Sequence, residues 1–145
     1  MRYKALAVAA AAIGTIALGT APASAAQNWG TVSTNSNWNC GAYKNHSVSD
    51  YVSFKICVVR NANNDAQTVL VVQNRASVAV AIGGEVQFQG GGHNEVAMCA
   101  ASTLNPGYTR GCYGPTYHVG SSIAQGKGWL ELNTVWNDYG QWISN

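Results

Sequence analysis

Hydrophobic and polar residues alternate along the clearest segment of the chain, residues 48–60. Its apolar positions recur at every second residue, which places them on one face of a strand: Val52, Phe54, Ile56 and Val58. After an Asn-rich turn at 61–65, residues 66–73 contain the unbroken run Val-Leu-Val-Val at 69–72. Such a run predicts a second strand that is covered on both faces.

Shorter β-type segments follow, bounded by turn-forming residues. We expect strands at residues 77–82, 85–89, 94–100, 108–119 (kinked at Gly114-Pro115) and 129–136. Between them we expect a hairpin turn at Gly83-Gly84, a flexible hairpin tip at 90–92, a turn at 104–107 and a loop at 120–128. About seven short strands without a helical period predict an all-β antiparallel sandwich, with immunoglobulin-like or Greek-key connections.

In the last of these strands, alternation separates two sets of side chains. Leu130 and Leu132 share one face with Thr134, and Trp129 and Glu131 share the other.

The first 25 residues have the three parts of a secretory signal peptide. Arg2 and Lys4 precede an apolar run at 5–18, and Ala-Pro-Ala-Ser-Ala at 21–25 supplies small residues for cleavage. The run is shorter than the roughly 20 residues that a membrane-spanning helix needs. We therefore expect cleavage after residue 25, secretion to the extracellular space, and one mature domain at 26–145 with a polar lead-in at 26–39.

Removing the signal also removes the apparent positive charge. Without Arg2 and Lys4, six of the eight basic residues remain, and they balance the six acidic ones. The mature chain has no run of like charge. We therefore expect neither a nucleic acid nor an anionic membrane surface as partner.

All four cysteines follow the signal: Cys40, Cys57, Cys99 and Cys112. An even number of cysteines in an exported chain predicts disulfides, and their spacings do not match structural zinc patterns. Three pairings are possible, and the spacing favours the neighbours, Cys40–Cys57 and Cys99–Cys112. Each would stabilise the fold by roughly 3 kcal/mol in the chain-entropy model.

Sequence motifs for catalysis are weak. The chain has no Gly-x-Ser-x-Gly elbow for a nucleophilic serine. His93 and Glu95 share a strand face and could bind a metal with His118, but an exposed polar pair is the simpler interpretation. We therefore assign no catalytic residue, metal ligand or cofactor, and a small secreted hydrolase built on scattered carboxylates or histidines remains a third alternative.

Aromatic residues with a polar edge are common and suit binding surfaces. Trp29, Trp38 and Trp142 lie in polar terminal segments, where we expect them to be exposed or to cap the sandwich. Trp129 and Trp136 are instead expected in the core or covering it. Because flat rings can stack on sugars, a carbohydrate-binding module using the first three is the second functional alternative.

The leading hypothesis is a secreted, non-enzymatic binding protein. The loop closed by Cys99 and Cys112 contains Asn105, Tyr108 and Arg110. Tyr and Arg are residue types that anchor interfaces, and a stapled loop loses less entropy on docking. The more specific form of this hypothesis is an enzyme inhibitor or an adaptor subunit that acts through this loop. The expected partner is an extracellular protein or a polysaccharide.

The alanine-rich signal, the two cysteine pairs and the Gly/Val/Asn-rich domain resemble small exported β-sandwich proteins of actinomycetes. In size, composition and disulfide number the chain is similar to the neocarzinostatin-type apoproteins, a resemblance that implies an immunoglobulin-like sandwich. Its disulfide loops are longer and it is richer in Trp and Asn, so no chromophore-binding residue is carried over. Exported enzyme inhibitors and adaptor subunits of secreted toxin particles share the same size and compartment.

Overall fold

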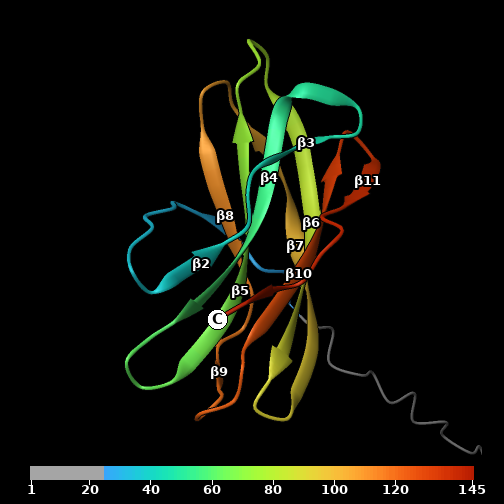
Figure 1. Cartoon of the computed structure of the whole chain (residues 1–145). Coiled ribbons are helices and arrows are strands. Elements are labelled where there is room, and N and C mark those ends of the chain that lie inside the picture. The colour runs from blue at the N-terminus through green and yellow to red at the C-terminus, as the bar shows by residue number, and fades with distance from the viewer. Residues whose placement is uncertain (1–24) are drawn as a thin grey trace, which may run out of the picture.

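The computed structural model describes residues 25–145 and shows two antiparallel β-sheets packed on each other (Figure 1). Every regular element in this range is a strand, and the range contains no helix. The predicted all-β sandwich is therefore confirmed. Residues 1–24, and with them nearly all of the predicted signal peptide at 1–25, lie outside the described part of the chain.

The first sheet has seven strands around the long neighbours β4 and β5. Its order is β1-β8-β5-β4-β2, with β3 beside β4 and β9 beside β5. The bounds are β1 Trp29–Gly30, β2 Trp38–Cys40, β3 Lys44–His46, β4 Ser49–Arg60, β5 Asp65–Asn74, β8 Thr109–Tyr113 and β9 Tyr117–His118.

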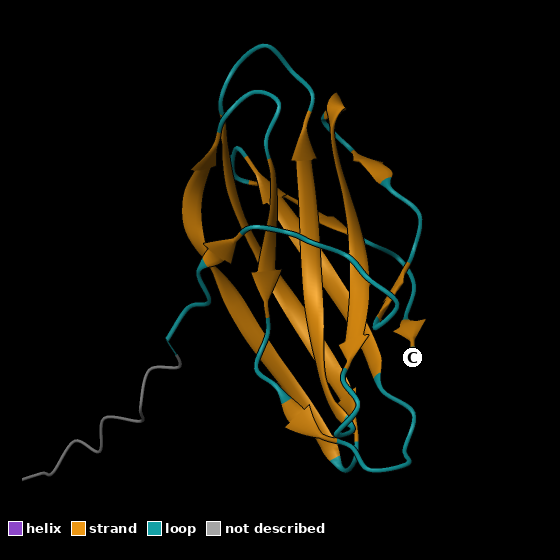
Figure 2. Ribbon diagram, turned by 90° about the vertical axis from the view of Figure 1, so that its left-hand side faces the viewer, coloured by secondary structure: helices purple, strands orange, loops and turns teal. Residues whose placement is uncertain are grey.

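The second sheet has five strands in the order β11-β10-β6-β7, with β12 also beside β10. Figure 2, coloured by secondary structure, shows only strands and loops in the described range. The bounds are β6 Val80–Gly90, β7 His93–Leu104, β10 Gln125–Leu132, β11 Val135–Asp138 and β12 Ile143–Ser144. Strands β5 and β8 are neighbours in the first sheet although β6 and β7 of the second sheet come between them in sequence. This interleaving is the Greek-key arrangement of immunoglobulin-like sandwiches.

The core between the sheets uses the face of β4 that the alternating pattern predicts. Phe54 and Ile56 are fully buried and pack in one cluster with Val86, Leu130 and Leu132 of the second sheet. The predicted shared face of the two leucines is thus confirmed. Burying one such side chain contributes about 1.5–3 kcal/mol relative to leaving it exposed.

Strand β5 is covered on both faces, as its apolar run predicts. Residues 69–72 are all 0% exposed. Leu70 and Val72 face the second sheet, whereas the other two face the outer side, where Val32 and Trp38 pack over them. The predicted lead-in at residues 26–39 therefore crosses the outer face of the first sheet and contributes β1 and the start of β2.

Both predicted disulfides are confirmed. Cys40 and Cys57 occupy directly opposite positions on β2 and β4, so their bond fixes the covering segment to the first sheet. Cys99 on β7 and Cys112 on β8 join the two sheets to each other.

The predicted hairpin turn at Gly83-Gly84 is wrong. Both glycines lie inside β6, which continues through them with a register shift against β7. A Cβ on Gly84 would lie 2.7 Å from Leu70 Cδ2 and 2.8 Å from the backbone oxygen of Trp129. Close packing therefore requires this glycine, not a turn. The hairpin between β6 and β7 lies at Gly91-Gly92, within the predicted tip.

The expected strand ends near the C-terminus also need correction. Strand β10 begins inside the predicted loop 120–128, and a turn at Asn133-Thr134 divides the predicted strand 129–136. Both turn residues have positive φ, 47° and 72°, as a type I′ hairpin requires. Thr134 therefore lies at the turn and not on the buried leucine face. The predicted strand 108–119 is likewise divided into β8 and β9, on either side of the kink expected at Gly114-Pro115.

Candidate binding surfaces

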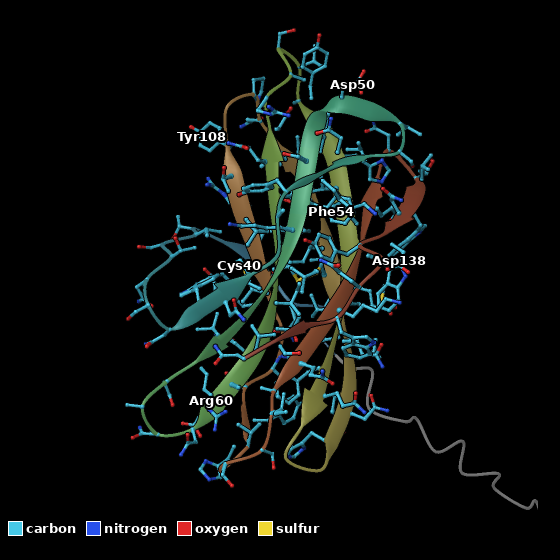
Figure 3. The ribbon with its side chains drawn as sticks, viewed as in Figure 1. Cys40, Asp50, Phe54, Arg60, Tyr108 and Asp138 are labelled. Atoms are coloured by element: carbon cyan, nitrogen blue, oxygen red, sulfur yellow. A yellow bond between two sulfur atoms is a disulfide. The ribbon has the colours of Figure 1, made fainter. Side chains whose placement is uncertain are left out.

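One end of the sandwich gathers the β5–β6 loop, residues 75–79, and the β7–β8 loop, residues 105–108; we call it the loop end. Figure 3 shows Tyr108 and Asp50 toward this end and Arg60 at the opposite end. The disulfide between β7 and β8 closes the segment that carries the second loop. The loop selected from the sequence is thus part of a larger surface.

Asn74 holds the two loops together. Its side chain is fully buried, and Nδ2 donates to Val78 O (2.9 Å) and Leu104 O (3.0 Å). Its Oδ1 accepts from the backbone N–H two residues later (2.9 Å). Its own backbone N–H donates to Tyr108 O (3.0 Å), and its carbonyl accepts from Gly107 N (2.8 Å). A fully paired buried polar group of this kind fixes the conformation around it.

Large apolar side chains are exposed around this hub. Tyr51 and Val78 are 63% and 62% exposed, and with Arg75 they line an open hollow of about 470 Å³. Arg75 is tied to the start of β4, because its backbone N–H donates to Tyr51 O (2.8 Å). Its guanidinium Nη2 also donates to Asp50 O (3.4 Å), so the loop end combines apolar area with an Arg guanidinium, a composition typical of interfaces.

The structure brings together Asn105, Tyr108 and Arg110, the loop residues predicted to bind. Tyr108 is 49% exposed, and its backbone N–H donates to Asn105 O (3.3 Å) across the turn. The guanidinium carbon of Arg110 lies 4.9 Å from the Tyr108 ring centroid, within cation–π distance. Arg110 is also held by a bond from Nη1 to Thr109 O (3.1 Å). The exposed ring thus rests on an anchored cation.

His46, in β3, is a buried titratable group near the same end, only 3% exposed. Its Nδ1 accepts from Val48 N (3.4 Å), which leaves the proton on Nε2 facing Leu130 O (3.2 Å). Burial lowers the pKa of His46, although the hydrogen bond to Leu130 O opposes the shift. Burial therefore favours the neutral form of His46 in the folded chain.

We expect this histidine to make the fold sensitive to mild acid. Because the folded-state pKa of His46 lies below the unfolded value of about 6.5, the unfolded chain binds the proton first, and stability falls as the pH drops through that value. Urea unfolding at a series of pH values should show this slope. His46→Gln should flatten it, and the His93→Gln control should keep it. An unchanged slope in His46→Gln would contradict the assignment.

The three tryptophans predicted to bind sugars lie apart from one another. Trp29 packs against the core, and its Nε1 donates to Ala100 O (2.7 Å). Trp38 packs edge to face on Tyr113 with ring centroids 6.0 Å apart. Trp142 is 39% exposed and lies just before β12. Of this set, Trp142 presents the most accessible ring.

Trp129 and Trp136 lie on the outer face of the second sheet. Trp136 is 45% exposed, so the expected core position is wrong for it, and Trp129 is half-buried. The missing information was the pairing of β11 with β10, which sets Trp136 opposite Glu131. The alternating pattern of β10 already indicated the outward position of Trp129, because a residue next to the buried Leu130 must face outward.

The end of the sandwich opposite the loop end carries the other two histidines. His93 stacks on Tyr117 with centroids 4.5 Å apart. His118 Nδ1 lies 3.0 Å from the Asp65 carboxylate, and this hydrogen bond lowers the pKa of Asp65. Among residues 25–145, no three His, Cys, Asp or Glu side chains cluster as a metal site requires.

The chain matches no protein-family model, no curated protein and no solved structure. Residues 25–145 contain no helix that is long and apolar enough to cross a membrane. What the protein binds must therefore be inferred from its own surfaces, the loop end and the outer face of the second sheet.

Proposed function

We propose that this is a secreted, non-enzymatic binding protein that docks an extracellular protein through the loop end. The observation that carries the proposal is Asn74, whose buried side chain fixes two neighbouring loops with exposed aromatic and apolar residues at their tips. Two disulfides, which persist in oxidising compartments, and the predicted signal peptide support the extracellular location.

Pre-organisation is the physical basis of this proposal. A partner that docks on loops already fixed loses less conformational entropy, so more of the contact energy becomes affinity. Tyr108 supplies an exposed ring backed by Arg110, and Tyr51 and Val78 add apolar area. A fixed loop of this kind suits an enzyme inhibitor that fills a cleft, or an adaptor subunit that holds a larger protein.

The double substitution Tyr108→Ala, Arg110→Ala should weaken partner binding by about tenfold or more, because removing interface anchors commonly costs over 1 kcal/mol each. Immobilised mature protein would capture partners from the culture supernatant, and the captured amounts would be compared with those of the unchanged chain. Trp136→Ala is the matched control, since it removes an exposed ring from the other surface.

Equal capture by the double variant and the unchanged chain would exclude the loop end as the docking surface. Loss of capture in the double variant alone would support it. Suppressed activity of a captured enzyme would then identify the inhibitor version, and unchanged activity the adaptor version.

A further inference from the structure

Trp129, Trp136 and Trp142 follow one another along the outer face of the second sheet; we call these three residues the tryptophan strip. On β10 the side chain of Leu130 lies in the core, so its neighbour Trp129 faces outward. Trp136 on β11 faces the same way because it pairs with Glu131, which is also outward on β10.

The third ring extends the strip in the other direction. Ile143 of β12 pairs with Gly126 of β10, and continuing this antiparallel register places Trp142 beside Lys127. In this register the three tryptophans fall in successive outward rows of the sheet, at Lys127, Trp129 and Glu131 of β10. Two residues of strand span about 7 Å. The result is a ladder of three tryptophans, one on β10 and two on the edge segment beside it.

Two carboxylates lie within this ladder. Glu85 on β6 pairs with Trp129, and Glu131 on β10 pairs with Trp136. Within residues 25–145 neither carboxylate forms a salt bridge. The rows of Trp129 and Trp136 therefore each have, beside the indole, a carboxylate without a salt-bridge partner.

Lys127 does not compensate these charges. Its Nζ lies 3.2 Å from Asp138 Oδ2 and 4.9 Å from the Trp129 ring centroid, so it is already engaged with both. The strip consequently keeps a net negative charge, and an acidic polymer would be repelled by it.

A hollow of about 180 Å³ adjoins the strip at Glu131 and Thr134. Gly83 lies beneath the Glu131 carboxylate, since a Cβ there would meet Glu131 Oε2 at 2.7 Å. Thr134, on the rim, holds a φ of 72°, a conformation that costs a β-branched residue about 1–3 kcal/mol. Strained residues of this kind concentrate at ligand sites, and this one is in the turn that sets Trp136 on the strip.

We propose that the tryptophan strip binds a polysaccharide of amino sugars with free, protonated amines, such as deacetylated chitin. The pyranose rings lie on the exposed indoles of Trp136 and Trp142, and the ammonium groups pair with Glu85 and Glu131. Indole is the aromatic ring with the strongest attraction for a cation, and a hydrogen bond between an ammonium and a carboxylate is of the strong, charge-assisted kind.

A basic peptide offers the same charge but fits the ladder less well. The tryptophans lie in three successive rows of the sheet, which suits a polymer that repeats one flat unit. A peptide with varied side chains has no reason to match that repeat. A competition experiment distinguishes the amino-sugar polymer from a basic peptide.

Purified mature protein should be retained on chitosan about tenfold more strongly than on cellulose or fully acetylated chitin. The buffer should be mildly acidic, so that the sugar amines carry a proton. Added salt should weaken retention, because exposed charges are screened. Equal retention on cellulose, or no retention on chitosan, would overturn the proposal.

Trp136→Ala should lower retention about tenfold, and Glu85→Gln with Glu131→Gln should remove most of its salt dependence. Trp142→Ala replaces the first variant if circular dichroism shows that it does not fold. The controls are Tyr108→Ala, which removes an exposed ring outside the strip, and Glu95→Gln, which removes an exposed carboxyl outside it. Both variants should bind chitosan like the unchanged chain. Retention unaffected by either tryptophan change would contradict the assignment.

Displacement by polylysine more effectively than by soluble glucosamine oligomers of equal charge would also overturn the proposal, in favour of a basic peptide. Preferential displacement by the oligomers would support it. Protein capture through Tyr108 and Arg110 is measured separately, so the loop-end proposal and this one can fail independently.

Discussion

Asn74→Ala should lower the free energy of unfolding by about 3 kcal/mol. The change removes three side-chain hydrogen bonds and leaves Val78 O and Leu104 O without their donor. A buried polar group that loses its partner costs about 1–3 kcal/mol. Because small domains are stable by only about 5–15 kcal/mol, this single substitution removes a large fraction of the total.

Urea unfolding would measure this loss. Asn105→Ala, an exposed asparagine in the neighbouring loop, is the control and should stay within about 0.5 kcal/mol of the unchanged chain. Asn74→Asp keeps an acceptor but loses the donor and adds a buried charge, so it should destabilise at least as much as Ala. A loss below about 1 kcal/mol for Asn74→Ala would show that water satisfies the freed groups, contrary to the structure.

The same variant also separates pre-organisation from direct contact at the loop end. Asn74 is fully buried and cannot touch a docked protein. If its role is to fix the loops, Asn74→Ala should weaken partner capture at temperatures where the chain remains folded. Tyr108→Ala, in contrast, should weaken capture with little loss of stability, since its ring is exposed.

Features encoded by neighbouring residues were predictable from the sequence. The alternating apolar positions of β4 and the unbroken run of β5 both specify burial within one strand, and the structure confirms both. The disulfides followed from compartment and spacing, because each pair closes a short segment. Tyr108 and Arg110 lie together for the same reason, because Tyr108 directly precedes β8 and Arg110 is two residues further along the chain.

Glycine has two roles in this chain that the sequence does not distinguish. At Gly91 and Gly92, with φ of 59° and 86°, it turns the backbone. At Gly84 and Gly128 it makes room for the first sheet, since a Cβ on Gly128 would lie 2.5 Å from Ile56 Cδ1. The second role depends on strands distant in sequence, which is why a turn at 83–84 was wrongly expected and the loop at 120–128 was expected to extend too far, past the start of β10 at residue 125.

Some parts of the candidate sites could not be predicted, because they depend on pairing between strands and loops that are distant in sequence. Asn74 has the residue type of a turn former, and only its bond to Leu104, 30 residues away, reveals its role as a hub. The tryptophan strip requires the pairing of β10 with β11 and β12. Neither pairing is visible until the turn at Asn133-Thr134 is placed.

The two proposed surfaces are separate on the molecule. Figure 3 shows Tyr108 and Asp138 on opposite sides of the sandwich, and Asp138 pairs with Trp129 of the strip. A protein partner centred on Tyr108 and Arg110 therefore leaves Trp129 uncovered. If both surfaces bind as proposed, the domain holds an extracellular protein on a polysaccharide, and this favours the adaptor version over the inhibitor version.

Gly84→Ala should destabilise the fold by about 3 kcal/mol, at the upper end of the usual cost of overpacking a core. The added methyl would meet Leu70 Cδ2 at 2.7 Å and the backbone oxygen of Trp129 at 2.8 Å. A side chain can shift to relieve such a contact. The backbone oxygen cannot do so without disturbing the pairing of β6 with β10, where Gly84 faces Leu130.

Gly30→Ala is the matched control, because a Cβ there would meet only the ring of Tyr113, at an ordinary 3.4 Å. Its unfolding free energy should stay within about 0.5 kcal/mol of the unchanged chain. Equal stability of the two variants in urea would show that the second sheet relaxes around position 84. If the sheet does not relax, the strain falls on the backbone that carries Trp129, and Gly84→Ala should also weaken retention on chitosan while Gly30→Ala leaves it intact.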